Sequence, residues 1–260
     1  MNRSPLRIVL FSEINSPFGY NFLMELTRHQ TLQIVGVVTQ PDTKLCEYYQ
    51  AEPAPVNIKS ATRSRGIPVL QPDNVNQASQ RLASFEADFF IIANYQQILS
   101  RRIFKLPKRF TLNFHPSLLP EYAGLWPFFW MARNHERHSG VSAIAINEII
   151  DAGDIVEQTT INLRGDESEV ELRTIHFGES LTLLRNVIGR LHTLRSEEFQ
   201  KQDFSKRSYY SRRDFALAGG FKRKPVAVRT VATSIGMTSK AIRGNNLAEC
   251  SSENGYARNG

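Results

Sequence analysis

The sequence has little cysteine and no long hydrophobic run. Its 260 residues include two cysteines, Cys46 and Cys250, which lie far apart and outside any Cys-x-x-Cys spacing. This pattern favours reduced thiols in a cytoplasmic protein over a disulfide framework or a zinc site. No window approaches about 18 consecutive apolar residues, so no membrane-spanning helix is expected. Residues 1–5 lead directly into a strand-like run, without the apolar segment and cleavage site of a signal peptide.

Most of the chain has no net charge, because basic and acidic residues balance, although the formal charge of the full sequence is +7. Residues 1–194 contain 19 Lys and Arg against 19 Asp and Glu, whereas residues 195–260 contain 13 against 6. The basic residues concentrate at 205–213 and 221–224. Such clusters can contact phosphate groups, and a solvated segment of mixed charge is the alternative.

The first 115 residues alternate short apolar runs with amphipathic stretches. Strands are predicted at 8–11, 32–39, 68–70, 87–94 and 111–115, and helices at about 19–28, 56–65 and 76–85. This alternation is typical of βαβ units. The continuous apolar run at 89–92 suits a strand that helices cover on both faces. The sequence therefore predicts an α/β fold with a doubly wound, mostly parallel sheet.

The second half predicts strands at 141–146 and 155–161, joined by a turn at Asp151-Ala-Gly-Asp154, and a helix from 169 to about 195. We expect a catalytic domain at 1–200 and a short basic C-terminal segment at 201–225 that packs on it. Residues 226–260 are rich in Gly, Ser, Asn and Thr with few large apolar residues, which predicts a disordered tail.

Two polar side chains, Asn113 and His115, end the last strand of the first half, and Pro116 follows them. Alternate residues of a strand share one face, so both side chains project together at the carboxyl end, where open α/β sheets bind ligands. Each residue also has a structural interpretation. His115 can serve packing, Asn113 can hydrogen-bond a loop, and Asp151-Ala-Gly153 can be a plain turn.

Together these segments resemble the formyltransferase family, which includes the glycinamide ribonucleotide, methionyl-tRNA and sugar N-formyltransferases. The family pattern is Asn-x-His-x-Ser-Leu-Leu-Pro, a Gly four residues on, Gly-Val-Thr/Ser and Asp-x-Gly. This sequence has Asn113-Phe-His115-Pro-Ser-Leu-Leu-Pro120, Gly124, Gly140-Val-Ser142 and Asp151-Ala-Gly153. The resemblance implies a Rossmann-like formyltransferase fold and 10-formyltetrahydrofolate as co-substrate. It also implies Asn113, His115 and Asp151 as catalytic residues.

Physical chemistry gives these residue types a task. An amine that attacks a formamide-like carbonyl creates a tetrahedral carbon with a negative oxygen, which an amide and an imidazolium can stabilise. A carboxylate near the imidazole can orient it or relay a proton through water. Asp154 is the rival of Asp151. His135-x-x-His138 has no evident third ligand, and no metal is expected.

By the same resemblance, the folate lies between the loops at 94–99 and 147–151. The predicted folate contacts are Asn94, Tyr95, Gln96, Ile98, Leu99, Ile149 and Ile150, of which Ile98 and Leu99 equally suit a plain core. The predicted contacts of the second substrate are Ser12, Asn15, Ser117, Trp130, Tyr209 and Arg212. Residues 12–19 depart from the Gly-x-Gly-Ser-Asn of the glycinamide ribonucleotide enzymes, which argues against a phosphoribosyl substrate.

The preferred hypothesis is formyl transfer to a small, phosphate-bearing biosynthetic amine, with an amino sugar nucleotide favoured. Segments 127–130 and 208–213 resemble those of sugar N-formyltransferases, and the C-terminal residues lack the alternation that a barrel domain needs. Methionyl-tRNA formylation is the first alternative because the basic segment suits RNA. A non-catalytic folate- or nucleotide-binding protein and a formyltetrahydrofolate hydrolase are the others. A homodimer is possible, and no membrane partner is expected.

Overall fold

The computed structural model describes residues 4–46, 49 and 55–220. The chain divides into two units, residues 1–224 and 225–260, and the description below concerns the first. The tail predicted at 226–260 lies outside the described residues.

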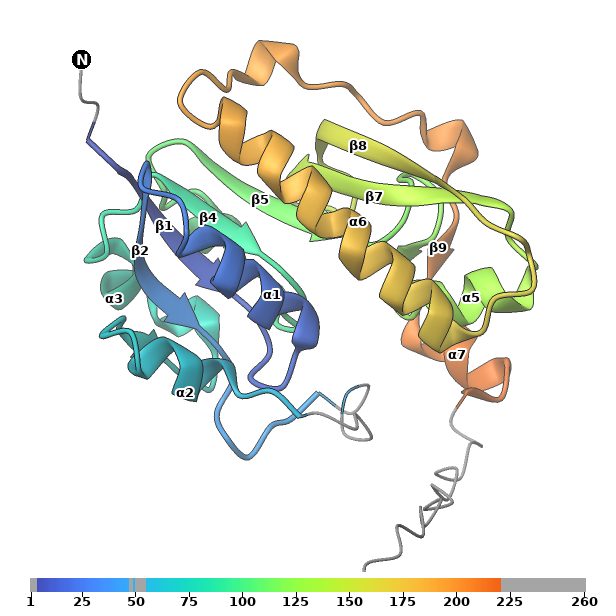
Figure 1. Ribbon diagram of the computed structural model, residues 1–260, viewed down its shortest axis with the longest axis horizontal. Helices are drawn as coiled ribbons and strands as arrows, with labels where there is room; N and C mark the ends of the chain where they lie inside the picture. The colour runs from blue at the N-terminus through green and yellow to red at the C-terminus, as the bar shows by residue number, and fades with distance from the viewer. Residues whose placement is uncertain (1–3, 47–48, 50–54, 221–260) are drawn as a thin grey trace, which may run out of the picture. The chain divides into compact units, whose positions relative to one another are not determined.

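A seven-stranded sheet forms the centre of the described chain, in the order β3-β2-β1-β4-β5-β7-β8 (Figure 1). The first five strands in this order, β3, β2, β1, β4 and β5, are paired in parallel, whereas β7 pairs antiparallel with both β5 and β8. The strands are β1 (Leu6–Phe11), β2 (Leu32–Val38), β3 (Val69–Leu70), β4 (Phe89–Ile92), β5 (Phe110–His115), β7 (His138–Ala145) and β8 (Asp154–Asn162). This arrangement confirms the predicted doubly wound, mostly parallel sheet.

Helices cover both faces of the sheet, with α1 and α6 side by side on one face and α3 on the other (Figure 1). The helices are α1 (Pro17–Leu26), α2 (Ile58–Arg63), α3 (Ser79–Ala83), α4 (Arg101–Phe104), α5 (Pro127–Arg133), α6 (Glu169–Arg190) and α7 (Arg212–Leu217). Short 3₁₀ helices are η2 (Val75–Gln77), η3 (Ser196–Glu198) and η4 (Phe204–Lys206).

The alternation of side chains along β1 explains why both faces are covered. Ile8 and Leu10 pack into one core cluster with residues of α1 and α6, whereas Val9 and Phe11 pack into a second with residues of α3 and α4. Successive side chains of a strand point to opposite faces, so a continuous apolar strand requires two cores. The sheet is thereby fixed between two layers, and its loops are free to form a site.

Helix α6 begins where the sequence indicates and ends earlier. Ser168 and Glu171 form a capping box at its start. The helix ends at Arg190, before the predicted 195, and Arg109 donates to the Leu191 carbonyl just beyond it. Arg185 of α6 makes a two-pronged ion pair with Glu25 of α1, at 2.8 and 2.9 Å. This pair ties the two helices together on one face of the sheet.

A second, two-stranded sheet joins distant parts of the chain. Strand β6 (Ala123–Gly124) pairs in parallel with β9 (Tyr209–Tyr210) of the basic segment. Gly124 has a φ of +93°, and a Cβ there would lie 2.3 Å from the Tyr210 carbonyl oxygen. The glycine of the sequence motif is therefore required by the close passage of β9.

Candidate active site

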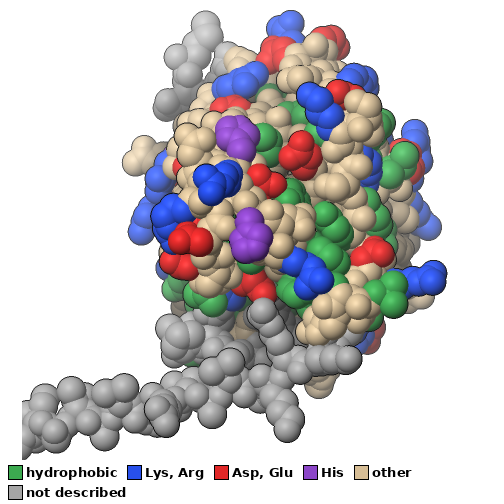
Figure 2. Space-filling model, turned by 90° about the vertical axis from the view of Figure 1, so that its right-hand side faces the viewer, with side chains coloured by type: hydrophobic (Ala, Val, Ile, Leu, Met, Phe, Trp, Pro, Cys, Tyr) green, Lys and Arg blue, Asp and Glu red, His purple; other side chains and the backbone are tan. Residues whose placement is uncertain are grey.

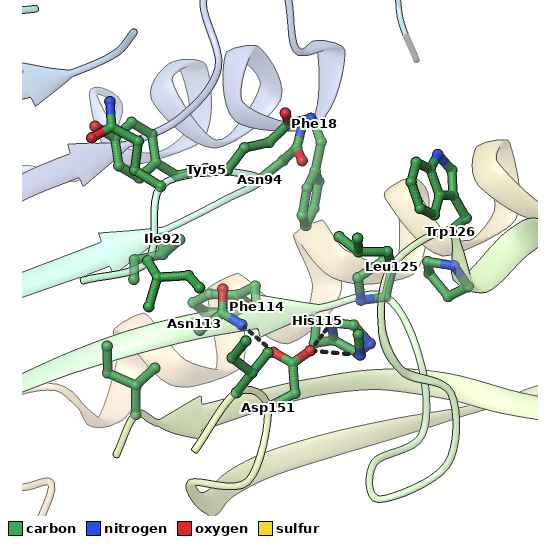
Figure 3. Close-up of a pocket in the computed structure, with 18 of the residues that line it drawn as sticks. Phe18, Ile92, Asn94, Tyr95, Asn113, Phe114, His115, Leu125, Trp126 and Asp151 are labelled. Carbon is green, nitrogen blue, oxygen red and sulfur yellow. Dashed lines mark hydrogen bonds and ion pairs between the residues drawn. The ribbon is translucent and has the colours of Figure 1, made fainter. Parts of the chain in front are cut away.

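A pocket of about 640 Å³ opens beyond the carboxyl ends of β4 and β5 (Figure 3). Loops after these strands, the turn between β7 and β8, and the start of α7 contribute to its wall. This is the edge at which open α/β sheets bind their ligands.

The three motif side chains meet at the floor of this pocket. The Asp151 carboxylate lies between the other two: Asn113 Nδ2 donates to Oδ1 at 3.3 Å, and His115 Nδ1 is 3.5 Å from Oδ2 (Figure 3). The backbone N–H of Gly124 donates to the same Oδ2 at 2.9 Å. The structure thus brings together residues that are up to 38 positions apart in the sequence.

His115 is held by its other nitrogen. Nε2 is 2.8 Å from the carbonyl oxygen of Tyr122, so it carries a hydrogen and donates. His115 is thus fixed between the Tyr122 carbonyl and the Asp151 carboxylate, with Nδ1 beside the pocket.

Asp151 has a constrained backbone. Its φ is +50°, a left-handed conformation that is uncommon for residues other than glycine. Asn147 supports the turn by donating from its amide to the Ala152 carbonyl at 2.9 Å. A Cβ on Gly153 would lie 2.0 Å from the Ala145 carbonyl, so glycine is the residue that fits there. The Asp-x-Gly motif is thus a carboxylate on a tight turn against the end of β7.

The loop after β4 forms the wall opposite Asn113, His115 and Asp151, which are called the trio below. Asn94 has a φ of +59° and donates from its amide to Ser16 Oγ at 3.2 Å. Glu13, which is fully buried, accepts from the Gln96 backbone N–H at 2.8 Å and from the Gln40 side chain. Burial raises the pKa of Glu13. This carboxyl group lies outside the pocket wall and fixes the loop from behind.

All seven predicted folate contacts line the pocket. Asn94, Tyr95, Gln96, Ile98 and Leu99 come from the loop after β4, and Ile149 and Ile150 come from the turn before Asp151. Ile98 and Ile149 are 67% and 61% exposed, so neither is a core residue. Exposed apolar side chains on two facing loops, such as Ile98 and Ile149, suit a flat aromatic ligand.

The predicted contacts of the second substrate divide into two groups. Tyr209 and Arg212 line the pocket. The other four, which the structure places outside the pocket wall, are Ser12, Asn15, Ser117 and Trp130.

Internal contacts account for these four positions. Ser12 and Ser117 are fully buried, and Ser117 donates to the Glu121 carbonyl. Asn15 bonds the backbone of Cys46 through both its amide atoms. Trp130 is stacked on Tyr210 with a ring-centre distance of 4.3 Å, so its ring is used in packing.

An aromatic part of the wall was not predicted from the sequence. Phe18, Phe128 and Phe177 line the pocket from α1, α5 and α6, and Phe18 stacks on Phe177 at 4.9 Å. Phe177 falls in the apolar pattern of a helix, which gives no sign that its ring borders a cavity. Such a wall contributes an apolar surface with no charge.

The two discounted alternatives have ordinary surface partners. Asp154 Oδ2 pairs with Lys201 Nζ at 2.6 Å, away from the pocket wall. His135 and His138 bond the Gly165 carbonyl and the Asn162 side chain. Among residues 4–46, 49 and 55–220 no group of three metal-ligating side chains occurs. No helix in the same part of the chain is long and apolar enough to cross a membrane.

Comparisons with known proteins identify the family of this chain. Residues 6–187 match the family model described as formyl transferase. The methionyl-tRNA formyltransferase of Thermotoga neapolitana is 32% identical over 197 residues, which cover 72% of this chain and 61% of that protein. The chain therefore spans less than two thirds of the length of this relative.

Two solved structures show the same fold at lower identity. The N-formyltransferase of Helicobacter canadensis, in complex with folinic acid and dTDP-3-aminofucose, has a TM-score of 0.61 and 17% identity. The match covers 81% of this chain and 72% of that one. Glycinamide ribonucleotide transformylase 1 of Symbiobacterium toebii has a TM-score of 0.62 and 18% identity, over 76% of this chain and 95% of that one.

Proposed function

The chain belongs to the formyl transferase family, and we propose that it transfers the formyl group of 10-formyltetrahydrofolate to a primary amine. The observation that carries this proposal is the contact of Asn113 and His115 with the Asp151 carboxylate at the floor of the pocket. The loops at 94–99 and 147–151 hold the folate on either side of that floor.

The chemistry follows from the positions of the three groups. The amine nitrogen attacks the formyl carbon, and the carbonyl oxygen takes up the negative charge. Asn113 Nδ2 has a second hydrogen besides the one directed at Asp151 and donates it to that oxygen, and His115 Nδ1 lies beside it. Asp151 accepts the proton that the amine loses, directly or through water. The bond to N10 of the folate then breaks, and N10 receives the proton.

The trio also separates a transferase from a non-catalytic binding protein. A folate-binding protein needs the apolar side chains of the two loops but has no use for a carboxylate that contacts Gly124, Asn113 and His115. A hydrolase would use the same trio with water in place of the amine. Tyr209 and Arg212 extend the pocket beyond the trio, which gives a second substrate a place to bind.

For the acceptor we favour an amino sugar nucleotide. Arg212 supplies a cation for a phosphate, and Tyr209, which is 45% exposed, supplies a ring surface for a base. On the face that Figure 2 shows, basic side chains are interspersed with acidic ones, in keeping with the balanced charge of residues 1–194. A small acceptor needs only a few cations, whereas an RNA needs a wide basic surface.

Methionyl-tRNA is the second candidate, and two observations favour it. The Thermotoga relative carries that name at 32% identity. The aromatic wall of Phe18, Phe128 and Phe177 offers an apolar site for a side chain next to the reacting amine.

Assays with each class of acceptor in turn distinguish the two candidates. The protein is incubated with 10-formyltetrahydrofolate and either amino sugar nucleotides or charged initiator tRNA, and the product masses are measured over a series of salt concentrations. A nucleotide with two phosphates should lose affinity gently with salt, and an RNA that contacts several phosphates should lose it steeply. Formylation of the tRNA with no turnover of any amino sugar nucleotide would contradict our preference. No formylated product from any amine would contradict the proposed activity.

A further inference from the structure

The basic segment after α6 reaches the active site from behind. Gln202 donates from Nε2 to the carbonyl oxygens of Asp151 and Gly153, at 3.0 and 2.7 Å. Arg207 donates to the same Asp151 carbonyl at 3.2 Å and to the Ile150 carbonyl at 2.7 Å. Two side chains of one segment thus hold the backbone of the turn that carries the Asp151 carboxylate.

The same segment holds the loop on the other side of the trio. Tyr122 N–H donates to Ser208 Oγ at 2.7 Å, and Leu125 N–H donates to the Tyr210 carbonyl at 2.8 Å. Between them lie the Tyr122 carbonyl, which accepts from His115, and the Gly124 N–H, which donates to Asp151. Residues 202–210 therefore contact the backbone on both sides of the contact between His115 and Asp151.

We propose that residues 202–210 form a clamp that completes the active site and that Arg207 is a positioning residue for Asp151. The left-handed backbone of Asp151 is strained and persists only when its surroundings fix it. Arg207 is suited to this task because its planar guanidinium donates to two successive carbonyls at once. Its position is fixed in turn by the rings of Phe204 and Tyr209, at 5.7 and 5.5 Å.

Without Arg207 the carbonyls of Ile150 and Asp151 lose these donors, and the turn relaxes toward an ordinary backbone conformation. The carboxylate then spends less time against His115 and Asn113. Positioning of this kind affects the step in which charge develops more than the binding of substrates. This inference rests on the proposed formyl transfer.

The test compares Arg207→Met and Arg207→Lys with Lys201→Met in the full chain. Lys201 lies in the same segment, is 84% exposed and pairs only with Asp154 among the described residues, so its loss removes a charge and an exposed ion pair but no contact with the backbone of Ile150 or Asp151. We expect kcat to fall roughly 10- to 100-fold in Arg207→Met with a similar KM for folate. Arg207→Lys should recover part of the loss, because an ammonium group can still reach a carbonyl. Lys201→Met should match the wild type.

Hydrogen–deuterium exchange gives a readout that does not depend on activity. The amides of Gly124 and Ala152 donate to Asp151 Oδ2 and the Ile149 carbonyl, so both should exchange faster in Arg207→Met while α6 remains protected. If Arg207→Met does not fold, Arg207→Lys and Gln202→Leu carry the same comparison. Unchanged exchange at both amides, or a loss confined to the KM for the acceptor, would overturn the proposal. An inactive wild type would refute the proposed function, and the exchange data would still decide the role of Arg207.

Discussion

Replacing Asp151 by Asn tests the trio with the smallest change of shape. Three groups converge on this carboxylate: Gly124 N–H at 2.9 Å, Asn113 Nδ2 at 3.3 Å and His115 Nδ1 at 3.5 Å. An asparagine has one acceptor oxygen, so whichever way its amide is turned, its NH₂ group must face a donor. The variant loses the charge beside His115 and at least one of the three interactions.

The expected cost follows from these contacts. A hydrogen bond to a charged group contributes about 1.5–3 kcal/mol, which corresponds to a rate effect of roughly 10- to 150-fold. Loss of a positioned proton acceptor costs about 100-fold or more by itself. We therefore expect kcat to fall at least about 100-fold, with folate binding nearly unchanged because the lost interactions act mainly in the transition state.

Steady-state kinetics with 10-formyltetrahydrofolate and titration with a folate analogue measure the two quantities separately. The matched control is Asp154→Asn, three residues away, whose carboxylate pairs with the exposed Lys201. It should keep wild-type turnover. Circular dichroism confirms that both variants fold. If Asp151→Asn keeps nearly full turnover, or if Asp154→Asn loses as much, the assignment of the trio is wrong.

Three further predictions concern stability. Burial lowers the pKa of His176 to about 4 from an ordinary value of 6.5, so the folded state favours the neutral ring and loses stability as pH falls below about 6.5. The loss should be about 2 kcal/mol between about pH 7 and about pH 5. Chemical denaturation at several pH values should show that the free energy of unfolding depends less steeply on pH in His176→Gln than in the wild type; an equal dependence on pH would contradict this. Gly124→Ala should lower the free energy of unfolding by about 1–3 kcal/mol because its Cβ meets the Tyr210 carbonyl. Gly178→Ala in α6, where a Cβ meets nothing within 4 Å, should be neutral or stabilising, and thermal melts that rank the two the other way would refute the role of β9. Truncation after Pro225 should leave the melting temperature nearly unchanged, because residues 226–260 have few large apolar side chains; a large drop would show that the tail packs on the rest of the protein.

The parts of the fold that the sequence predicts are those with a periodic or local signal. The apolar run at 89–92 predicts β4, and the alternation along β5 predicts that Asn113 and His115 project together, as they do beside Asp151. The two loops expected to hold the folate are predicted from the resemblance to the formyltransferase family, and their seven residues line the pocket.

The remaining features depend on contacts that leave no such signal. Strand β9 has only two residues, and its partner β6 lies more than 80 positions away. Arg207 and Gln202 donate to backbone carbonyls, which every residue has, so no residue pattern predicts their contacts with the turn at Asp151. Trp130 resembles a substrate contact by its motif, yet Tyr210 packs over its ring.

Tetrahydrofolate release that depends on an amine tests the central claim most directly. Wild-type protein is mixed with 10-formyltetrahydrofolate labelled in the formyl carbon, with and without the acceptor panel, and labelled formylamine, formate and tetrahydrofolate are quantified together. The proposed function predicts one labelled formylamine for each tetrahydrofolate released, little release without an amine, and none above background for His115→Ala. Equal release without an amine, with the label recovered as formate, would show a hydrolase instead.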